Sequence, residues 1–243
     1  MNRFTKRFFP HLKRKRNKTD IPQSFTEALN NNDLTDLTKE GLEITFDAII
    51  NNDILKSIPV IGIIVATIRT SKNIINLFFL KKLVSFLKGV SDIQPEKREA
   101  MIKKIDKSNK YRQKIGDFLL FQINHCDDDL KAFYLSIAFR AVINEELSYE
   151  DFMRISNIIN RLPTIDFEDF IKRNEFHEED TLLIGCGLLS IHNPANVIED
   201  SEYINIDIGN GLDVRTTVIG ETIKHIYESI DDNLKRLYSF DET

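Results

Sequence analysis

The feature that most constrains the fold is the apolar run at residues 57–70, "SIPVIGIIVATIRT", with Lys56 before it and Arg69 near its end. Its first 12 residues carry no charge. As a helix this stretch would be about 18 Å long, whereas the hydrocarbon core of a bilayer is roughly 30 Å thick. The run cannot cross a membrane alone, and its length is more typical of a buried core helix.

A second apolar segment, "KNIINLFFLKKLVSFLKG", follows directly and carries four lysines. The two segments predict an apolar helical hairpin over residues 54–90, with Pro59 in the first helical turn and Ser57 as its N-cap. Such a hairpin either fills a core or meets a membrane after a trigger. The residues on which this choice depends are Ile58, Pro59, Ile61, Ile64, Phe78 and Phe79.

The N-terminal segment is strongly basic, although the 243-residue chain carries a net charge of −5. Its cations are Arg3, Lys6, Arg7, Lys13, Arg14, Lys15, Arg16 and Lys18, with no acid among the first 18 residues. We expect a flexible arm over residues 1–23 that contacts anionic lipid, nucleic acid or an acidic partner. The alternative is a solvated chain end with no partner.

Composition favours a mainly α fold. Hydrophobic residues make up 42% of the chain, there are only 9 Gly and 6 Pro, and Ile and Leu recur at intervals of three and four. This pattern predicts a multi-helix bundle over residues 24–146 that contains the apolar hairpin. The remaining residues, 147–243, form a second predicted domain.

The second domain is predicted to be winged-helix-like. Ile204, Ile206 and Ile208 alternate with polar residues and are followed by Gly209-Asn210-Gly211 and then by Leu212 and Val214. This pattern predicts a β-hairpin that turns at the glycines. Helices before the hairpin and a last helix, "VIGETIKHIYESI", complete the order of a winged-helix unit.

The charges of this domain disfavour nucleic acid as a partner. Between Thr164 and Leu189 the acids are Asp166, Glu168, Asp169, Glu175, Glu178, Glu179 and Asp180, against only Lys172 and Arg173. Phosphate contacts supply much of the affinity for DNA, and an acidic surface repels phosphate. Protein recognition or structural packing therefore fits better, with a winged-helix transcriptional regulator as a second alternative.

No metal, cofactor or catalytic site is predicted. The cluster "NHCDDD" at 124–129 holds metal-ligand residue types, but its His and Cys lack partners at ligand spacing, and the acids are explained as a helix cap. His192 and His225 have no nucleophile pattern beside them, so we expect a protein that is not an enzyme. Cys126 and Cys186 show no paired spacing, and the basic N-terminus lacks the apolar region of a secretory signal, which indicates the cytoplasm.

The segments "SIPVIGIIVATIRT", "LFFLKKLVSFLKGV", "YRQKIGDFLLFQI" and "DLKAFYLSIAFRAVINEELSYEDFMRISNII" resemble bacterial helical proteins of abortive infection, the Abi-alpha type. The similarity covers roughly residues 45–240 and includes the "GLL" and "TTVIGE" tail. It implies a bacterial phage-defence protein without an established active site. The first hypothesis is non-enzymatic binding of an unidentified phage or defence protein. The alternative is a membrane-perturbing effector that uses the basic arm and the 57–90 hairpin at the inner membrane. Homo-oligomer formation is left open.

Overall fold

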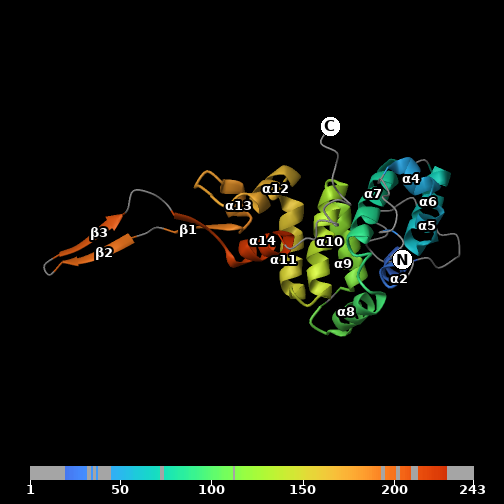
Figure 1. The fold of residues 1–243 in the computed structure, drawn as a ribbon, viewed down its shortest axis with the longest axis horizontal. Helices are drawn as coiled ribbons and strands as arrows, with labels where there is room; N and C mark the ends of the chain where they lie inside the picture. The colour runs from blue at the N-terminus through green and yellow to red at the C-terminus, as the bar shows by residue number, and fades with distance from the viewer. Residues whose placement is uncertain are drawn as a thin grey trace. The chain divides into compact units, whose positions relative to one another are not determined.

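The computed structural model describes residues 20–31, 34, 37, 45–71, 74–111, 113–192, 195–200, 203–208 and 213–228. These residues are mainly helical, which confirms the prediction of a mainly α fold (Figure 1). Internal contacts divide the chain into two units, the first reaching Asn160 and the second spanning Arg161–Ser229.

The first unit is built of helices. They are α2 (Ile21–Leu29), α4 (Phe46–Asn51), α5 (Asp53–Ser57), α6 (Pro59–Ser71), α7 (Ile74–Gly89), α8 (Pro95–Lys107), α9 (Ile115–His125), α10 (Asp129–Ile143) and α11 (Tyr149–Arg161). α7 packs along α10 and also contacts α6 and α9, so the apolar segment that ends at Gly89 lies inside the unit (Figure 1).

Aromatic rings fill the centre of this unit. The Phe86 ring of α7 lies 6.0 Å from the Phe25 ring of α2 and 6.0 Å from the Phe139 ring of α10, centroid to centroid. Gly89 lets α7 approach α10 closely, because a Cβ at this position would lie 1.8 Å from Ser136 Oγ. Burial of these rings is the main contribution to the stability of such a core.

α6 begins at Pro59 as predicted, but the predicted N-cap is wrong. Ser57 ends the preceding helix α5, and its hydroxyl donates to the Ile54 carbonyl at 2.7 Å. Ile58 separates the two helices, and its carbonyl accepts the Gly62 N–H at 3.0 Å. Proline fits the first turn of α6 because the N–H that it lacks would have no intrahelical partner there.

α11 belongs to the first unit, so the division of the chain falls later than the predicted boundary at residue 147. Its start is capped by Ser148, whose Oγ accepts the Asp151 N–H at 3.1 Å. Phe152 is fully buried, and its ring lies 5.4 Å from that of Phe139 and 6.0 Å from that of Phe118. These ring contacts join α11 to α10 and α9.

The second unit combines short helices and strands. They are α12 (Thr164–Lys172), α13 (Thr181–Gly185), β1 (Leu189–His192), β2 (Ala195–Asp200), β3 (Tyr203–Ile208), β4 (Asp213–Thr216) and α14 (Val218–Glu228). α14 packs on α12, where the Tyr227 ring meets the Phe167 ring edge-on at 5.3 Å.

The predicted strand pairing is wrong. β3 does not pair with β4; it pairs antiparallel with β2, with Tyr203 opposite Asp200. β4 pairs with β1, with Thr216 opposite Leu189. The glycine turn at 209–211 lies outside the described residues. β2 was missed because Val197 and Ile198 are adjacent and break the alternation that marks a half-buried strand.

Candidate functional site

The predicted basic arm, with its cations from Arg3 to Lys18, lies outside the described residues. The predicted hairpin residues are described, and they do not share one surface. Ile58 and Ile61 are fully buried, Ile64 and Phe79 nearly so, and Pro59 is half-buried. Phe78, in contrast, is 56% exposed.

The buried side chains of the opening run agree with the core-filling alternative; they are Ile58, Val60, Ile61, Ile64, Val65 and Ile68. In the part of the chain that the structure describes, every helix is too short or too polar to span a bilayer. The conspicuous apolar segment thus has a structural explanation, namely the packing of α6 on α2, α5 and α7.

The 124–129 cluster caps a helix, as predicted. Asp128 Oδ1 accepts the Lys131 N–H at 2.7 Å at the start of α10, and the buried Lys131 ammonium pairs with Asp127. Burial raises the pKa of Cys126 to about 12, so its sulfur is a neutral thiol at neutral pH. No group of three or more His, Cys, Asp or Glu residues within the described ranges could hold a metal ion.

One serine and histidine pair in the second unit was not anticipated. On β1, Ser190 Oγ lies 3.0 Å from His192 Nε2, and Asp213 is the cross-strand partner of His192. The Asp213 carboxylate is bound by Arg215 at 2.5 Å. Because the carboxylate is held by Arg215 and the pair is solvent-exposed, the three residues do not form a catalytic triad.

A hollow of about 640 Å³ opens in the first unit, between the end of α8 and the α10–α11 connection. It is lined by Met101, Lys104, Ile105, Ser108, Tyr111, Val142, Glu145, Leu147, Ser148, Tyr149 and Glu150. The four aliphatic members are buried, whereas the charged members are more exposed. The hollow therefore has an apolar floor and a polar rim. Its size lies within the range of small-molecule sites.

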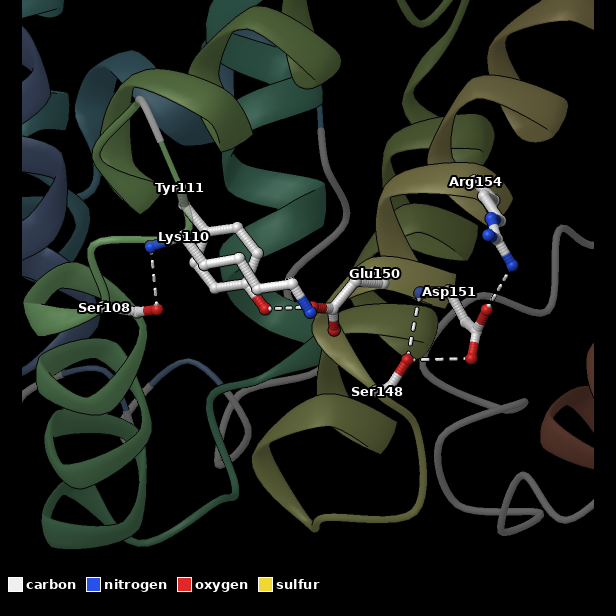
Figure 2. A network of polar contacts seen from close by, with 7 residues as sticks. All are labelled: Ser108, Lys110, Tyr111, Ser148, Glu150, Asp151 and Arg154. Carbon is white, nitrogen blue, oxygen red and sulfur yellow. Dashed lines mark hydrogen bonds and ion pairs between the residues drawn. The ribbon is translucent and has the colours of Figure 1, made fainter.

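The rim is organised by the carboxylate of Glu150, which joins the α8–α9 connection to the start of α11 (Figure 2). Glu150 Oε1 accepts the Tyr111 hydroxyl at 2.6 Å and pairs with the Lys110 ammonium. The hydrogen bonds from Lys110 and Tyr111 lower the pKa of Glu150 to about 2. Burial, together with this carboxylate, raises the pKa of Tyr111 to about 12. At neutral pH the carboxylate is thus charged and the phenol is protonated.

Tyr149 brings a second phenol to the lining of the hollow. Its side chain is 6% exposed, and its ring packs edge-on against Tyr111 at 4.6 Å. Burial raises the pKa of its phenol, which is therefore neutral. No hydrogen bond joins its hydroxyl to another described residue, and this oxygen is not one of the fully buried polar atoms that lack a partner.

Glu145 on the same rim has an unusual backbone. Its φ is 64°, the left-handed region that favours glycine. The residue follows the C-cap Asn144 of α10, where the Glu146 N–H reaches the Ala141 carbonyl and the Glu145 N–H reaches the Val142 carbonyl. Glycine is the usual residue here, and a side chain costs about 1 kcal/mol. The carboxylate pairs with Lys104 at 2.7 Å.

In the second unit, the loop between α12 and α13 is held by two cations. Arg173 binds Asp180 at 2.5 Å and lies 4.9 Å above the Phe176 ring. The buried Lys224 of α14 donates to the Arg173 carbonyl and to Asn174 Oδ1, and it also contacts Phe176. The loop is thus anchored to α14 by hydrogen bonds and cation–π contacts.

The anchored loop presents acids outward. Glu175, Glu178 and Glu179 are exposed, and they form no ion pair with any described residue. The same unit exposes four large apolar side chains, Ile165, Leu182, Ile191 and Val218, of which Ile165 is 75% and Val218 86% exposed. Exposed acids on an anchored loop suit the recognition of a basic protein surface.

No protein-family model, curated protein or solved structure matches the chain. The fold defines a mainly helical protein with two units, and any further assignment rests on the residues themselves.

Proposed function

We propose that the protein acts in bacterial phage defence, in the manner of an abortive-infection protein, by binding another protein without catalysis. The observation that carries this proposal is the anchored acidic loop 173–180 of the second unit. Its exposed Glu175, Glu178 and Glu179 lack intramolecular partners among the described residues, so their charge is available to a basic surface. The role in defence is implied by the resemblance of the sequence to Abi-alpha proteins.

The second unit is proposed to be winged-helix-like, with the acidic loop as part of its recognition surface. The order α12, α13, paired strands and α14 supports this description. α13 has only five residues, which is short for a helix that reads the major groove. Together with the acidic charge, this favours a protein partner over DNA, and a transcriptional role has less support.

The proposal is tested by phage challenge of bacteria that express the chain. Glu175→Lys, Glu178→Lys and Glu179→Lys are combined, and we expect protection against a phage that the wild type restricts to be lost. A matched control combines Glu27→Lys, Glu96→Lys and Glu146→Lys, three exposed acids of the first unit. Full protection by the first variant, or equal loss in both, contradicts the proposal. Circular dichroism and the Tm establish that both variants fold.

A peripheral membrane role is a second candidate, favoured by one observation. Ile75 and Phe78 lie three residues apart on one face of α7 and are 72% and 56% exposed. Insertion of such side chains at a membrane surface is favourable when cations lie nearby, and the basic arm would supply them. Flotation with vesicles rich in anionic lipid tests this role. Binding that is lost with Ile75→Ser and Phe78→Ser supports it, and the absence of binding excludes it.

A further inference from the structure

We infer that the hollow between α8 and the α10–α11 connection is a binding site for a small, uncharged ligand with an aromatic or otherwise flat apolar body. This inference concerns the first unit, so it does not depend on the proposed function of the second unit.

The size of the hollow and its apolar floor indicate which apolar group the ligand carries. Ile105, Val142 and Leu147 are buried residues that line a volume of about 640 Å³. Tyr111 and Tyr149 add two rings that meet edge-on at 4.6 Å. An apolar floor with aromatic walls favours a ligand that buries a ring, because ring contacts add to the free energy of apolar burial.

The charges of the rim exclude a strongly charged ligand. Lys110 pairs with Glu150 (Figure 2). Lys104 pairs with Glu145, so each of these two cations has an anion of the rim beside it. Two further acids lie near the rim: Asp151 is engaged by Ser148 and Arg154, and the Asp106 carboxylate accepts the Ile115 N–H. A phosphate or carboxylate ligand would have to displace one of these pairs. The balanced rim therefore favours a neutral molecule.

The Tyr149 hydroxyl indicates which polar group the ligand carries. Tyr149 lines the hollow and is 6% exposed, and no described residue forms a hydrogen bond with its hydroxyl. A bound molecule with one hydroxyl or carbonyl group would complete this hydrogen bond. The tyrosine is held in place by the Phe118 and Phe152 rings, each 6.0 Å away.

Three probes that share the naphthalene ring system separate the contributions of the apolar ring, the hydrogen bond and the charge to the affinity. 2-Naphthol is uncharged and can hydrogen-bond, naphthalene lacks the polar group, and 2-naphthoate carries a negative charge. Dissociation constants are measured by ligand-observed NMR with the full chain. We expect 2-naphthol to bind most tightly. Equal or tighter binding of 2-naphthoate overturns the claim of an uncharged ligand.

Two variants assign the binding to the hollow. Tyr149→Phe keeps the ring and should weaken 2-naphthol by about 3- to 10-fold while leaving naphthalene unchanged, since one hydrogen bond is lost. Tyr134→Phe makes the same change in α10 outside the hollow and should alter neither. Ser108→Trp places a large side chain at the rim and should abolish binding of both probes.

The inference fails if the wild type binds no 2-naphthol at its solubility limit, which would leave the hollow to an apolar side chain of a partner protein. It also fails if Ser108→Trp binds as the wild type does, because the probes would then occupy another site. Unchanged affinity of Tyr149→Phe for 2-naphthol would contradict the role of the hydroxyl. This variant removes one oxygen from a packed ring, so it tests the inference even if Ser108→Trp does not fold.

Discussion

In the first unit the apolar run at residues 57–70 buries Ile58, Ile61 and Ile64, whereas in the second unit Ile165 and Val218 remain 75% and 86% exposed. The same residue types thus serve a core in one region and a surface in the other. The cations of the two units also differ in role. In the first unit Lys82 of α7 donates to the carbonyls of Asn124 and Cys126 at the end of α9. In the second unit Lys224 anchors a loop that displays acids.

This comparison teaches that the hydrophobicity of a segment does not indicate where a protein meets its partners. The run that dominates the sequence has a sufficient role inside the bundle. The candidate surfaces lie instead on less conspicuous residues, which the fold holds in place through buried cations and rings. Four changes would break or sharpen this comparison, and they are ordered by the size of the expected effect.

The largest effect is expected from Gly89→Ala. The new Cβ would lie 2.8 Å from Ser136 Cβ and 1.8 Å from its Oγ, so α7 and α10 would be pushed apart at a cost of about 3 kcal/mol. Urea unfolding measures this loss. Gly185→Ala in the second unit is the control, because its Cβ would meet no atom within 4 Å. If Gly89→Ala is as stable as the wild type, or if adding Ser136→Gly restores nothing, the close packing of α7 on α10 is contradicted.

An intermediate effect is expected from Lys224→Met in α14. The variant removes the donor to Arg173 and Asn174, and we expect a loss of about 2 kcal/mol because these hydrogen bonds are charge-assisted. Hydrogen exchange should rise in the loop 173–180. Lys172→Met is the control, since this exposed lysine has only a long ion pair with Glu168. Unchanged exchange in the loop would show that Lys224 does not anchor it.

A smaller effect, of opposite sign, is expected from Glu145→Gly. Glycine relieves the left-handed backbone, and the exposed Lys104 pair contributes little, so stability should rise by about 1 kcal/mol. Glu146→Gly, at the neighbouring exposed residue, should not stabilise the protein. Higher stability of Glu145→Gly would indicate that Glu145 is retained for the hollow at the expense of stability. Lower stability of this variant would show that the Glu145 carboxylate supports the fold.

The smallest expected effect is on the stability of the protein at acidic pH. The pKa of Glu150 is lowered to about 2 in the folded protein, so its contribution is present above the unfolded value near 4.5 and is lost as the pH falls toward 2. Carboxyl NMR should therefore show Glu150 titrating well below the normal range. Lys110→Ala should raise its pKa, whereas Lys103→Ala, which removes the partner of Glu99, should not. A normal pKa for Glu150 in the wild type would contradict the rim geometry.

Much of the helical fold was predictable from local patterns. Pro59 marked a helix start, because this signal depends on residues within one helical turn. The acids at 127–129 were likewise recognised as a cap. Pairings between segments that are distant in the sequence were harder to predict. Strand β3 was assigned to the wrong partner because the glycines at 209–211 were a stronger turn signal than residues near Asp200.

The candidate sites were largely not predictable. The hollow joins Tyr111 to Tyr149 and Glu150, which are more than 35 residues away, and no motif links them. The acidity of residues 164–180 was apparent in the sequence, but its anchoring by Lys224 was not, since that contact spans about 50 residues. The place of the Tyr149 side chain at the hollow is a property of packing, which composition does not contain.

The central claim is that function lies on the anchored acidic loop and not on the apolar hairpin. It is tested most directly by plating efficiency of one restricted phage on two variants side by side. One carries Glu175→Lys, Glu178→Lys and Glu179→Lys, and the other carries Ile75→Ser and Phe78→Ser, which change the exposed apolar face of α7. The account predicts that only the first variant loses protection. Loss in the second variant with full protection in the first would contradict it.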